Sequence, residues 1–596
     1  MRMEMVIEQK PWVLEAVPGQ EEVAHLMGEV PALHPSVAAL LVQRGITDRQ
    51  KLRPFVNASL ENLHDPYLYK GMERAVAALQ EAIVSQWPVM VMGDYDVDGT
   101  TAVALFSQLL EHFTPHVHVY IPDRYTEGYG VSPEAVAHAA AIGCKLFVSL
   151  DCGTSNVVEV AQARALGMEF IICDHHLAGP VLPDATAILN ARQLDCPYPF
   201  KELSGCGVGF KLMQAYLMRH AESQYGLLEQ YLDVMAVSIC ADLVRLEDEN
   251  RTLAKLGLEK INTKPSPGLE ALINSAGLGR GADGNYTIDC QRVIFSLAPR
   301  INSAGRMEHG KFAVDLLKAQ DAGKAWELAQ RLDKHNTTRR ETDFDVARQA
   351  LEMIEQDPFL KASWGTVLYH EDWNRGVVGI TASRVVDQYY RPTVVLTRVE
   401  NDMAAGSARS VHGFDLYGAL QQCSHLLEQF GGHKYAAGLS LPIAQIEAFR
   451  HKFDEVVRAQ MPPLKRHQQV GAHLEVTFGQ VLEGDEGRRF WTHLQQVAPF
   501  GVGNPIPLFV TRGLRLCLDS KILNHRLTGE PAHLALKVED PLTGHRREAV
   551  GWRMAHKMPE LRAAQRIDIA YTLEEHRYGE RPPYLRLVLV DVKAGE

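Results

Sequence analysis

The spacing of apolar residues changes along the chain and indicates several structural regions. From Pro88 onward, short apolar runs alternate with segments in which apolar residues recur at helical spacing. This alternation is typical of βαβ units on a parallel sheet. The apolar runs are VMVMG (89–93), HVHVYI (116–121), KLFVSL (145–150), EFIIC (169–173) and AILN (187–190). We therefore expect a doubly wound α/β domain in this part of the chain.

A long segment without glycine or proline follows, from Lys324 to Asp357. Its apolar residues keep helical spacing, and one helix of ~34 residues would span about 50 Å at 1.5 Å per residue. A break within the polar stretch NTTRRETD is equally compatible with the pattern. After Pro358, a second α/β pattern begins with TVLYH, GVVGITASRVVDQ and TVVLTRV.

From about residue 466, closely spaced strand patterns predominate, and they suit a small barrel such as the oligonucleotide-binding (OB) fold. The fold class expected is α/β with this barrel at the C-terminal end. The expected regions are an N-terminal cap (1–70), a parallel-sheet domain (71–322), a helical linker (323–358), a second α/β domain (359–465) and the barrel (466–596).

Length and composition are those of a multidomain globular protein. The 596 residues exceed what one hydrophobic core supports. The nine cysteines form no C-x-x-C pair, and neither a signal peptide nor an apolar run of about 18 residues is evident. We expect a soluble cytoplasmic protein with no membrane association. Lys+Arg 61 against Asp+Glu 73 gives a net charge of -12, which argues against nucleic acid only if charge is spread evenly.

Three of the expected strands end in acidic residues or histidines. Because the carboxyl ends of parallel strands meet at one edge of a sheet, side chains from these three loops are expected to lie together. Each loop is expected to precede a helix. The residues are Asp94, Asp96 and Asp98 after the first run, Asp151 after the third, and Asp174, His175 and His176 after the fourth. Asp242 follows the apolar segment VMAVSICA, and we expect it to contribute to the same site from a fourth segment.

A divalent metal centre explains this gathering of carboxylates. Like charges this close raise one another's pKa unless cations neutralise them. Hard oxygens with one or two imidazoles suit Mn²⁺ or Mg²⁺, and histidine favours Mn²⁺. Taken singly, the D-x-D-x-D-G stretch could be a calcium-type loop or a turn, Asp242 a helix cap, and the histidines ordinary polar residues. The coincidence of three such loops favours the metal centre.

A candidate phosphate-binding segment is APRINSAGRM (298–307), expected as a loop after the strand-like FSL. Two guanidinium groups beside small residues can approach a phosphodiester backbone closely. A helix-capping loop with solvated arginines is the alternative.

The motifs GDYDVDGTTA, DCG, DHH and the aspartate of ADLV resemble the four metal-site motifs of the DHH phosphoesterases, and RINSAGRM resembles the RecJ exonucleases of that family. The resemblance covers roughly residues 70 to 596. It implies that two metal ions, Mn²⁺ or Mg²⁺, are bound by Asp96, Asp98, Asp151, His175 and Asp242, with Asp151 as the bridge. It further implies catalytic support from Asp94, Asp174 and His176. Cys152 stands where family members commonly have asparagine, so local hydrogen bonding is expected to differ.

The second α/β region resembles the DHH-associated domain in its NRGVVGITASR, GSARS and GGHKYAAGLSL segments. By resemblance, Arg384, Ser407 and Arg409 form a 5′-phosphate pocket, and the glycine-rich segment presents backbone N–H groups to phosphate. The substrate contacts implied are Arg300, Asn302, Ser303, Arg306, Arg384, Ser407, Arg409, Gly431, Gly432 and His433.

The activity implied by the resemblance is 5′-to-3′ hydrolysis of single-stranded DNA to mononucleotides, in DNA recombination and repair. Single-stranded-DNA-binding protein and a RecQ-type helicase are implied as partners, and a monomer is expected. Two other hypotheses are a phosphoesterase for small substrates such as cyclic dinucleotides, and a non-catalytic nucleic-acid-binding scaffold. The barrel and RINSAGRM argue against the first, and the retained acidic residues argue against the second.

Overall fold

The structure is a computed structural model that describes residues 11–16, 18–461, 469–525, 529–576 and 584–595. The chain divides into two compact units. The larger comprises residues 60–467, and the smaller comprises residues 1–59 with 468–596. The predicted boundary between residues 465 and 466 lies outside the described residues. Within the described ranges, no helix is long and apolar enough to cross a bilayer.

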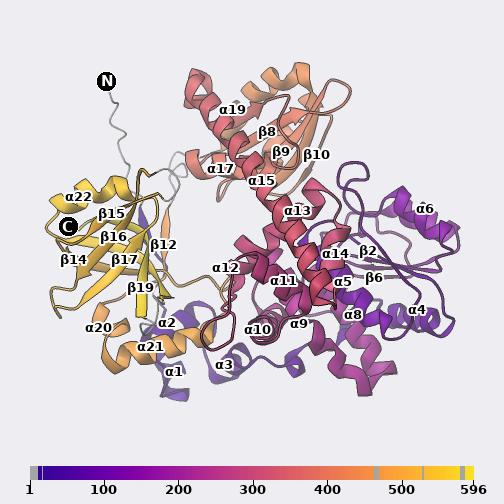
Figure 1. Cartoon of the computed structure of the whole chain (residues 1–596), viewed down its shortest axis with the longest axis horizontal. Helices are drawn as coiled ribbons and strands as arrows, with labels where there is room; N and C mark the ends of the chain where they lie inside the picture. The colour runs from indigo at the N-terminus through magenta and orange to yellow at the C-terminus, as the bar shows by residue number, and fades with distance from the viewer. Residues whose placement is uncertain (1–10, 17, 462–468, 526–528, 577–583, 596) are drawn as a thin grey trace. The chain divides into compact units, whose positions relative to one another are not determined.

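A five-stranded parallel sheet forms the centre of the first part of the larger unit (Figure 1). The predicted strands are all present in the order β3-β2-β4-β5-β6. They are β2 (Val89–Gly93), β3 (Val117–Tyr120), β4 (Leu146–Leu150), β5 (Glu169–Cys173) and β6 (Ala187–Leu189). The chain passes from β2 to β3 on one side and then returns to β4 on the other. The strand order therefore reverses between β2 and β4, the usual place for a ligand site in an open α/β sheet.

Helices pack around this sheet and complete the first domain, residues 60–321. The central one is α5 (Val97–Glu111), in which nearly every residue is buried. The others near the candidate site are α8 (Gly205–His220), α9 (Leu232–Ala241), α10 (Asp248–Thr263), α13 (Ala298–Met307) and α14 (Lys311–Lys318). Helices α9 and α10 approach closely at Gly257, where a Cβ atom would lie 2.0 Å from the carbonyl oxygen of Leu232.

The segment expected as a loop at residues 298–307 is instead helix α13. The FSL residues before it belong to a π-helical turn, η4 (Val293–Leu297), and not to a strand. Small residues in this segment serve close packing, because a Cβ atom on Gly305 would lie 2.9 Å from the carbonyl oxygen of Tyr95. The sequence interpretation as a flexible loop was therefore wrong.

A single helix, α15 (Ala322–Gln356), connects the first domain to the second domain, residues 358–461. Its 35 residues run without a break through NTTRRETD, which resolves the alternative left open by the sequence. The second domain has a mixed sheet in the order β10-β11-β9-β8-β7, in which only β7 and β8 are parallel. Its elements near the site are β7 (Thr366–Tyr369), α17 (Val378–Tyr389), β8 (Thr393–Arg398), β9 (Met403–Arg409), β10 (Gln429–Gly432) and β11 (Ala436–Pro442).

The smaller unit contains the predicted barrel. Strand β14 pairs with both β18 and β16, so five strands form a closed ring in the order β14-β18-β19-β17-β16, as in an OB fold. They are β14 (Phe509–Leu516), β16 (Pro531–Glu539), β17 (Arg546–Gly551), β18 (Ile567–His576) and β19 (Tyr584–Ala594).

Two helical features of the smaller unit were not predicted. The N-terminal helices α1 (Gln20–Glu29), α2 (Pro35–Gln43) and α3 (Arg49–Val56) share one apolar core with the barrel. Helix α21 (Gly484–Val497) lies within the region read as strands, and it buries Phe490, Leu494 and Val497 on one face. The N-terminal segment is thus part of the barrel unit.

Replacing Gly257 by alanine tests the contact between α9 and α10. The added methyl group collides with the backbone of Leu232, so the substitution should lower the stability of the first domain by about 1–3 kcal/mol. Scanning calorimetry of the full chain measures this as a lower transition temperature. The control is Gly226→Ala, since nothing lies within 4 Å of a Cβ there. Equal transition temperatures for both variants would contradict the predicted packing.

Candidate metal centre and neighbouring basic cluster

Predicted metal ligands from four segments converge at the carboxyl edge of the parallel sheet. The Nε2 atom of His175 lies 3.1 Å from Oδ1 of Asp151, 3.7 Å from Oδ2 of Asp242 and 3.9 Å from Oδ2 of Asp98. Two overlapping groups have ligand atoms within 4.8 Å of one another. They are Asp151, His175 and His176, and Asp98, His175 and Asp242. Two overlapping donor sets suit a pair of neighbouring cations.

The backbone after β4 is strained where it presents Asp151. This residue has a φ of 60°, in the left-handed region that non-glycine residues rarely adopt. Gly205 at the start of α8 approaches it so closely that a Cβ atom would lie 2.5 Å from Oδ1 of Asp151. A fixed turn and a glycine therefore hold this carboxylate in one position.

Asp98 is oriented by hydrogen bonds from two other helices. Its Oδ2 accepts a bond of 2.6 Å from the N–H of Gly205, and its Oδ1 accepts from the N–H of Cys206 at 3.1 Å. The hydroxyl of Ser238 in α9 donates to Oδ1 at 2.6 Å. The first two donors belong to the N-terminal turn of α8, where the helix dipole favours negative charge. These three donors hold the carboxylate of Asp98 in one orientation.

Asp174 fixes the orientation of His176. Its Oδ1 lies 2.8 Å from Nδ1 of His176, and its Oδ2 accepts from the N–H of Thr154. Burial alone would raise the pKa of Asp174, but these hydrogen bonds outweigh burial and lower it. The same bond outweighs the effect of burial on His176 and raises its pKa. The hydroxyl of Tyr129 also contacts the His176 ring, at 3.1 Å from Nδ1 and 3.2 Å from Nε2.

The loop that carries Asp174, His175 and His176 differs from the sequence expectation in one respect. It leads into β6 and not into a helix. The reason is local, because a loop containing Gly179, Pro180 and Pro183 follows and does not support helix formation.

Carboxylates of the centre have raised pKa values, and two oxygens lack partners. Burial, and next the charge of a neighbouring aspartate, raise the pKa of Asp94, Asp151 and Asp242 well above the usual range. Oδ1 of Asp94 and Oδ1 of Asp151 are buried without a hydrogen bond, although His175 lies close to the latter. Unpartnered carboxylate oxygens beside an imidazole are a donor set that fits divalent cations.

Asp96 and Cys152 lie close to the centre in different surroundings. Asp96 caps α5, with Oδ1 accepting from the N–H of Gly99 at 3.2 Å, and its charge contributes to the raised pKa of Asp151 and Asp242. It is not in either group of close ligand atoms. Cys152 is fully buried in an apolar cluster, and burial raises the pKa of its thiol. The residue therefore contributes a neutral packing group.

The RINSAGRM segment places its polar side chains in different surroundings. Ser303 is fully buried, and its hydroxyl donates to the carbonyls of Arg300 and Leu332. Arg300 is paired with Asp333 at 2.8 Å, and Arg306 donates to the carbonyl of Gly376 in the second domain at 2.7 Å. Asn302 lies partly exposed on α13. Their assignment as substrate contacts stays a prediction.

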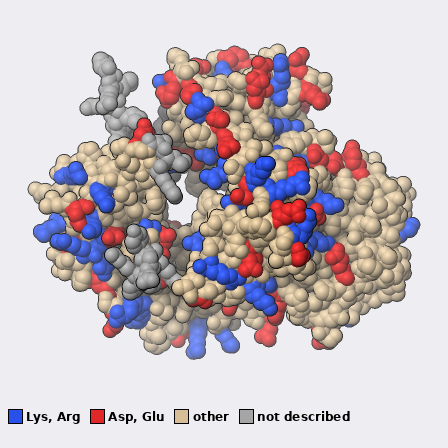
Figure 2. Space-filling model, viewed as in Figure 1, with Lys and Arg blue, Asp and Glu red and all other residues tan. Residues whose placement is uncertain are grey.

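Arginines from both domains gather near Arg306. Burial, followed by the charges of Arg124 and Arg339, lowers the pKa of Arg306 to about 10. Burial and the charge of Arg124 also lower the pKa of Arg409. Figure 2 shows blue side chains grouped over the part of the molecule where α13 and α15 lie, with red ones interspersed. Basic side chains are therefore concentrated locally in an acidic protein.

In the second domain, Ser407 and Arg409 lie beside the start of α17. Nη1 of Arg409 donates to the hydroxyl of Ser407 at 2.6 Å. A Cβ atom on Gly379, in the first turn of α17, would lie 3.1 Å from both side chains. No side chain caps this helix, so its first N–H groups face the same place. Arg384 is turned toward α15, where Oδ2 of Asp343 accepts two of its N–H groups at 2.7 and 2.9 Å.

The glycine-rich segment forms an exposed hairpin between β10 and β11. Gly431 and Gly432 end β10, and His433 donates its N–H to the carbonyl of Ala436. Gly432 has a φ of 141°, and a Cβ atom there would lie 2.4 Å from that carbonyl. The role of Gly431, Gly432 and His433 as substrate contacts stays a prediction.

Sequence reasoning missed several residues of the site. Tyr129, Ser238 and Gly205 each contact a predicted ligand or its neighbour. Glycines on both sides of Tyr129 were a usable signal, because an aromatic residue in such a loop is often functional. No sequence signal marked Ser238 or Gly205, because their roles depend on tertiary contacts.

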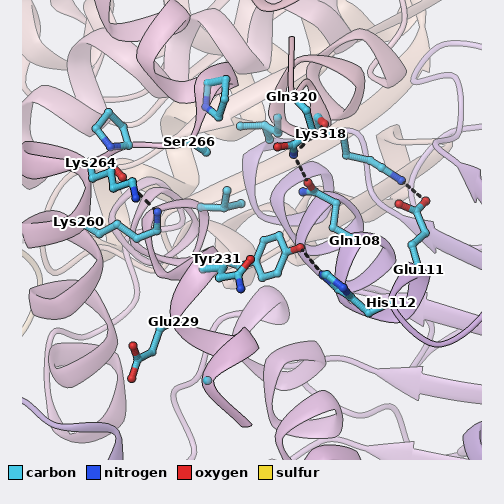
Figure 3. Close-up of a pocket in the computed structure, with 16 residues that line it drawn as sticks. Gln108, Glu111, His112, Glu229, Tyr231, Lys260, Lys264, Ser266, Lys318 and Gln320 are labelled. Atoms are coloured by element: carbon cyan, nitrogen blue, oxygen red, sulfur yellow. Dashed lines mark hydrogen bonds and ion pairs between the residues drawn. The ribbon is translucent and has the colours of Figure 1, made fainter. Parts of the chain in front are cut away.

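A separate cavity of about 900 Å³ lies away from the metal centre, at the far end of α5 (Figure 3). Two of its lysines, Lys260 and Lys318, lie beside acidic partners. Lys318 donates to Glu111 at 2.6 Å, and Lys260 lies 3.5 Å from Asp233. His112 and the hydroxyl of Tyr231 contact each other at 3.2 Å. Neither group of potential metal ligands contributes a residue to the lining of this cavity.

Comparison with known proteins accounts for this architecture. Residues 88–239 match the DHH family N-terminal domain, residues 363–459 the DHHA1 domain, and residues 484–588 the RecJ OB domain. The single-stranded-DNA-specific exonuclease RecJ of Escherichia coli K12 is 32% identical over 575 residues, covering 94% of this chain and 95% of that protein. The chain belongs to the RecJ family. The Bacillus subtilis RecJ is 36% identical over 509 residues, which are 84% of this chain and 62% of that protein.

Solved RecJ structures share the fold. A crystal structure of Thermus thermophilus RecJ in complex with Mn²⁺ matches with a TM-score of 0.80 at 26% identity, over 98% of this chain and 80% of that one. A second, in complex with Mg²⁺, matches with a TM-score of 0.75. The α/β fold and the OB domain expected from the sequence are thus confirmed for this RecJ-family chain.

Replacing Asp151 by asparagine removes a carboxylate from the centre and keeps a side chain of the same shape. The metal-free variant should be more stable than the metal-free parent at neutral pH, because repulsion between buried carboxylates is reduced. Mn²⁺ should stabilise the parent by about 2.7 kcal/mol at one hundred times the Kd, and the variant much less. Thermal unfolding of both proteins with and without Mn²⁺ measures the two effects. A variant that is less stable without metal and equally stabilised with it would refute this electrostatic account.

The same two proteins should differ in how their stability without metal depends on pH. The raised pKa of Asp151 means that the metal-free folded state binds more protons than the unfolded chain, whose aspartates titrate near ~4. Stability of the metal-free parent should therefore fall as pH rises from that value toward the folded-state pKa. The asparagine variant should lose less over the same interval, and parallel curves would count against the raised pKa.

Proposed function

We propose that this chain is a divalent-metal-dependent exonuclease that degrades single-stranded DNA from the 5′ end and releases 5′-mononucleotides. The observation that carries the proposal is the convergence of Asp98, Asp151, His175 and Asp242 within ligand distance beside a basic cluster. Membership in the RecJ family supports the substrate class, since the relatives are named single-stranded-DNA-specific exonucleases.

Asp98, Asp151, His175 and Asp242 would hold two divalent ions, Mn²⁺ or Mg²⁺, with Asp151 between them and Asp96 completing the set. When bound, such ions supply an activated hydroxide and neutralise charge that develops on a phosphate. The chain itself contributes a rigid arrangement of the side chains that would hold these ions. The hydrogen bonds to Asp98 and the fixed turn at Asp151 keep the ligands in place before substrate arrives.

Asp174 and His176 form the proton-handling pair in this proposal. The carboxylate holds the ring through Nδ1, and His176 is half-exposed, with 49% of its side chain accessible. The hydrogen bond to Asp174 raises the pKa of His176 and so favours the protonated ring, which would donate a proton to the leaving oxygen of the cleaved strand. Asp94 is buried beside Asp96 with one unpartnered oxygen, which suits a supporting acceptor for a bound water or ligand.

Directionality would follow from Ser407, Arg409 and the start of α17. A hydroxyl, a guanidinium group and free helix N–H groups together suit a terminal phosphate, which carries more charge than an internal one. A strand anchored there by its 5′ end is cut at a fixed distance from that end. Gly431, Gly432 and His433 would add contacts from the exposed hairpin.

The cellular setting is part of the proposal and rests on the family. We infer action in the cytoplasm in DNA recombination and repair, as a monomer. A single-stranded-DNA-binding protein and a RecQ-type helicase are the partners inferred, since both supply or expose single strands.

Digestion of 5′-phosphorylated single-stranded DNA, labelled separately at each end, tests the activity. The intact protein with Mn²⁺ or Mg²⁺ should release mononucleotides from the 5′ end and leave blunt duplex DNA uncut. Asp151→Ala should lower the rate by roughly a thousandfold or more, because a shared ligand is lost.

Other outcomes of that assay identify other functions. Hydrolysis of dinucleotides without attack on the long strand would favour a small-substrate phosphoesterase. Binding of the strand without cleavage in either metal would favour a scaffold. Release from the 3′ end would overturn the proposed polarity alone.

Arg409→Gln tests the proposed 5′-phosphate pocket. The ratio of cleavage rates for 5′-phosphorylated and 5′-hydroxyl strands should fall about tenfold, because a charge-assisted hydrogen bond to the terminal phosphate is lost. Arg398→Gln is the control, since Arg398 is exposed in β8 of the same domain and pairs with Glu371 at 3.0 Å. An unchanged ratio in Arg409→Gln would place the phosphate elsewhere.

A further inference from the structure

The loop that follows β3 carries Tyr129, and apolar packing does not fix this side chain. Tyr129 is 53% exposed. The residues on either side, Gly128 and Gly130, have φ values of 85° and 89°, which glycine adopts readily. The hydroxyl of Tyr129 nevertheless lies 3.1 Å from the carbonyl oxygen of Asp151 and 3.1 Å from Nδ1 of His176. The position of this hydroxyl therefore depends on the residues that anchor the loop.

Glu127 anchors the loop from three directions. Its Oε1 accepts a hydrogen bond of 2.8 Å from the N–H of Asp123. Its Oε2 accepts from the hydroxyl of Tyr120, in β3, at 2.9 Å and from that of Ser132 at 2.5 Å. Ser132 is the N-cap residue of helix α6 (Pro133–Ala141). One carboxylate thus joins the end of β3, the loop and the start of α6.

Asn156 anchors the loop on the other side of Tyr129. Its Oδ1 accepts from the N–H of Val131 at 3.2 Å, and its Nδ2 donates to the carbonyl of Val131 at 3.0 Å. Glu127 lies two residues before Tyr129, and Val131 lies two residues after it. These two anchors hold an exposed side chain in place where packing does not.

We propose that Glu127 is a positioning residue for strand cleavage, because it fixes the loop so that Tyr129 holds the ring of His176 beside Asp151. The inference rests on the proposed function, in which His176 donates a proton to the leaving oxygen. The three groups that donate to Glu127 are neither predicted metal ligands nor predicted substrate contacts. Its effect on cleavage therefore passes through Tyr129.

The test is a double-mutant cycle between Glu127→Ala and Tyr129→Phe. The full chain cleaves 5′-phosphorylated single-stranded DNA with Mn²⁺, and kcat and KM are measured for each variant. Each single substitution should lower kcat about tenfold with KM nearly unchanged, because the contact that orients His176 is lost or displaced. In the Tyr129→Phe background, Glu127→Ala should lower kcat by about twofold or less, because the contact through which Glu127 acts is already absent.

Glu134→Ala is the matched control. Glu134 is exposed in the first turn of α6. Burial, and next Glu127 and then Glu134, raise the pKa of Tyr120, so both carboxylates act on the same tyrosine. Glu134→Ala and Glu127→Ala remove the same charge, and kcat of the control should equal that of the parent. Glu127→Gln should recover most of the kcat, because the amide oxygen still accepts from Asp123 and the two hydroxyls can turn to accept from the amide N–H groups.

The outcomes that would overturn the inference are separate. Losses that add to about a hundredfold in the double variant would exclude the route through Tyr129. A kcat equal to that of Glu134→Ala would exclude the positioning role itself. The increase in transition temperature caused by Mn²⁺ should be the same in Glu127→Ala and the parent, and a smaller increase would place the effect at the metal centre. Failure of the parent chain to cleave single strands would instead contradict the proposed function.

Discussion

The larger unit depends on one constraint. This constraint is the mutual repulsion of buried carboxylates at one edge of the parallel sheet. Burial and neighbouring charge raise the pKa of Asp94, Asp151 and Asp242. The fold opposes this cost with fixed donors, chiefly the N-terminal turn of α8 against Asp98. The left-handed turn at Asp151 is backbone strain of the kind that persists at functional sites, and bound cations would offset the repulsion of the carboxylates.

The acidic centre and the arginine cluster suit different parts of a nucleic-acid strand. A phosphodiester needs cations near its cleaved bond and basic donors along the rest of the backbone. Arg306, at the middle of the arginine cluster, links the two domains, because it extends from α13 of the first domain to the carbonyl of Gly376 in the second. The net charge of -12 conceals this arrangement, because the formal sum counts every aspartate of the predicted metal centre as an uncompensated negative charge.

Local patterns predicted the sheet well, because strand formation depends on short-range information. Apolar runs gave all five strands, and Asp98, Asp151 and His175 lie near one another as their positions in the sequence led us to expect, while their role as metal ligands stays a prediction. Tertiary context decided the rest. Residues 298–307 were expected to form a loop after a strand-like FSL, but they form helix α13, in which Gly305 packs closely against Tyr95. The N-terminal helices pack on a barrel more than 400 residues away in sequence, which no local pattern reports.

The unbroken course of α15 has a geometric consequence. Each residue of an α-helix advances the chain by 1.5 Å and rotates it by about 100°. A helix shared by two domains therefore fixes their angular phase as well as their separation. A one-residue insertion would turn the second domain's attachment by more than a quarter of a circle, whereas a length change by a whole turn would nearly preserve its orientation. We therefore expect the length of this connection to change only in steps of about one helical turn.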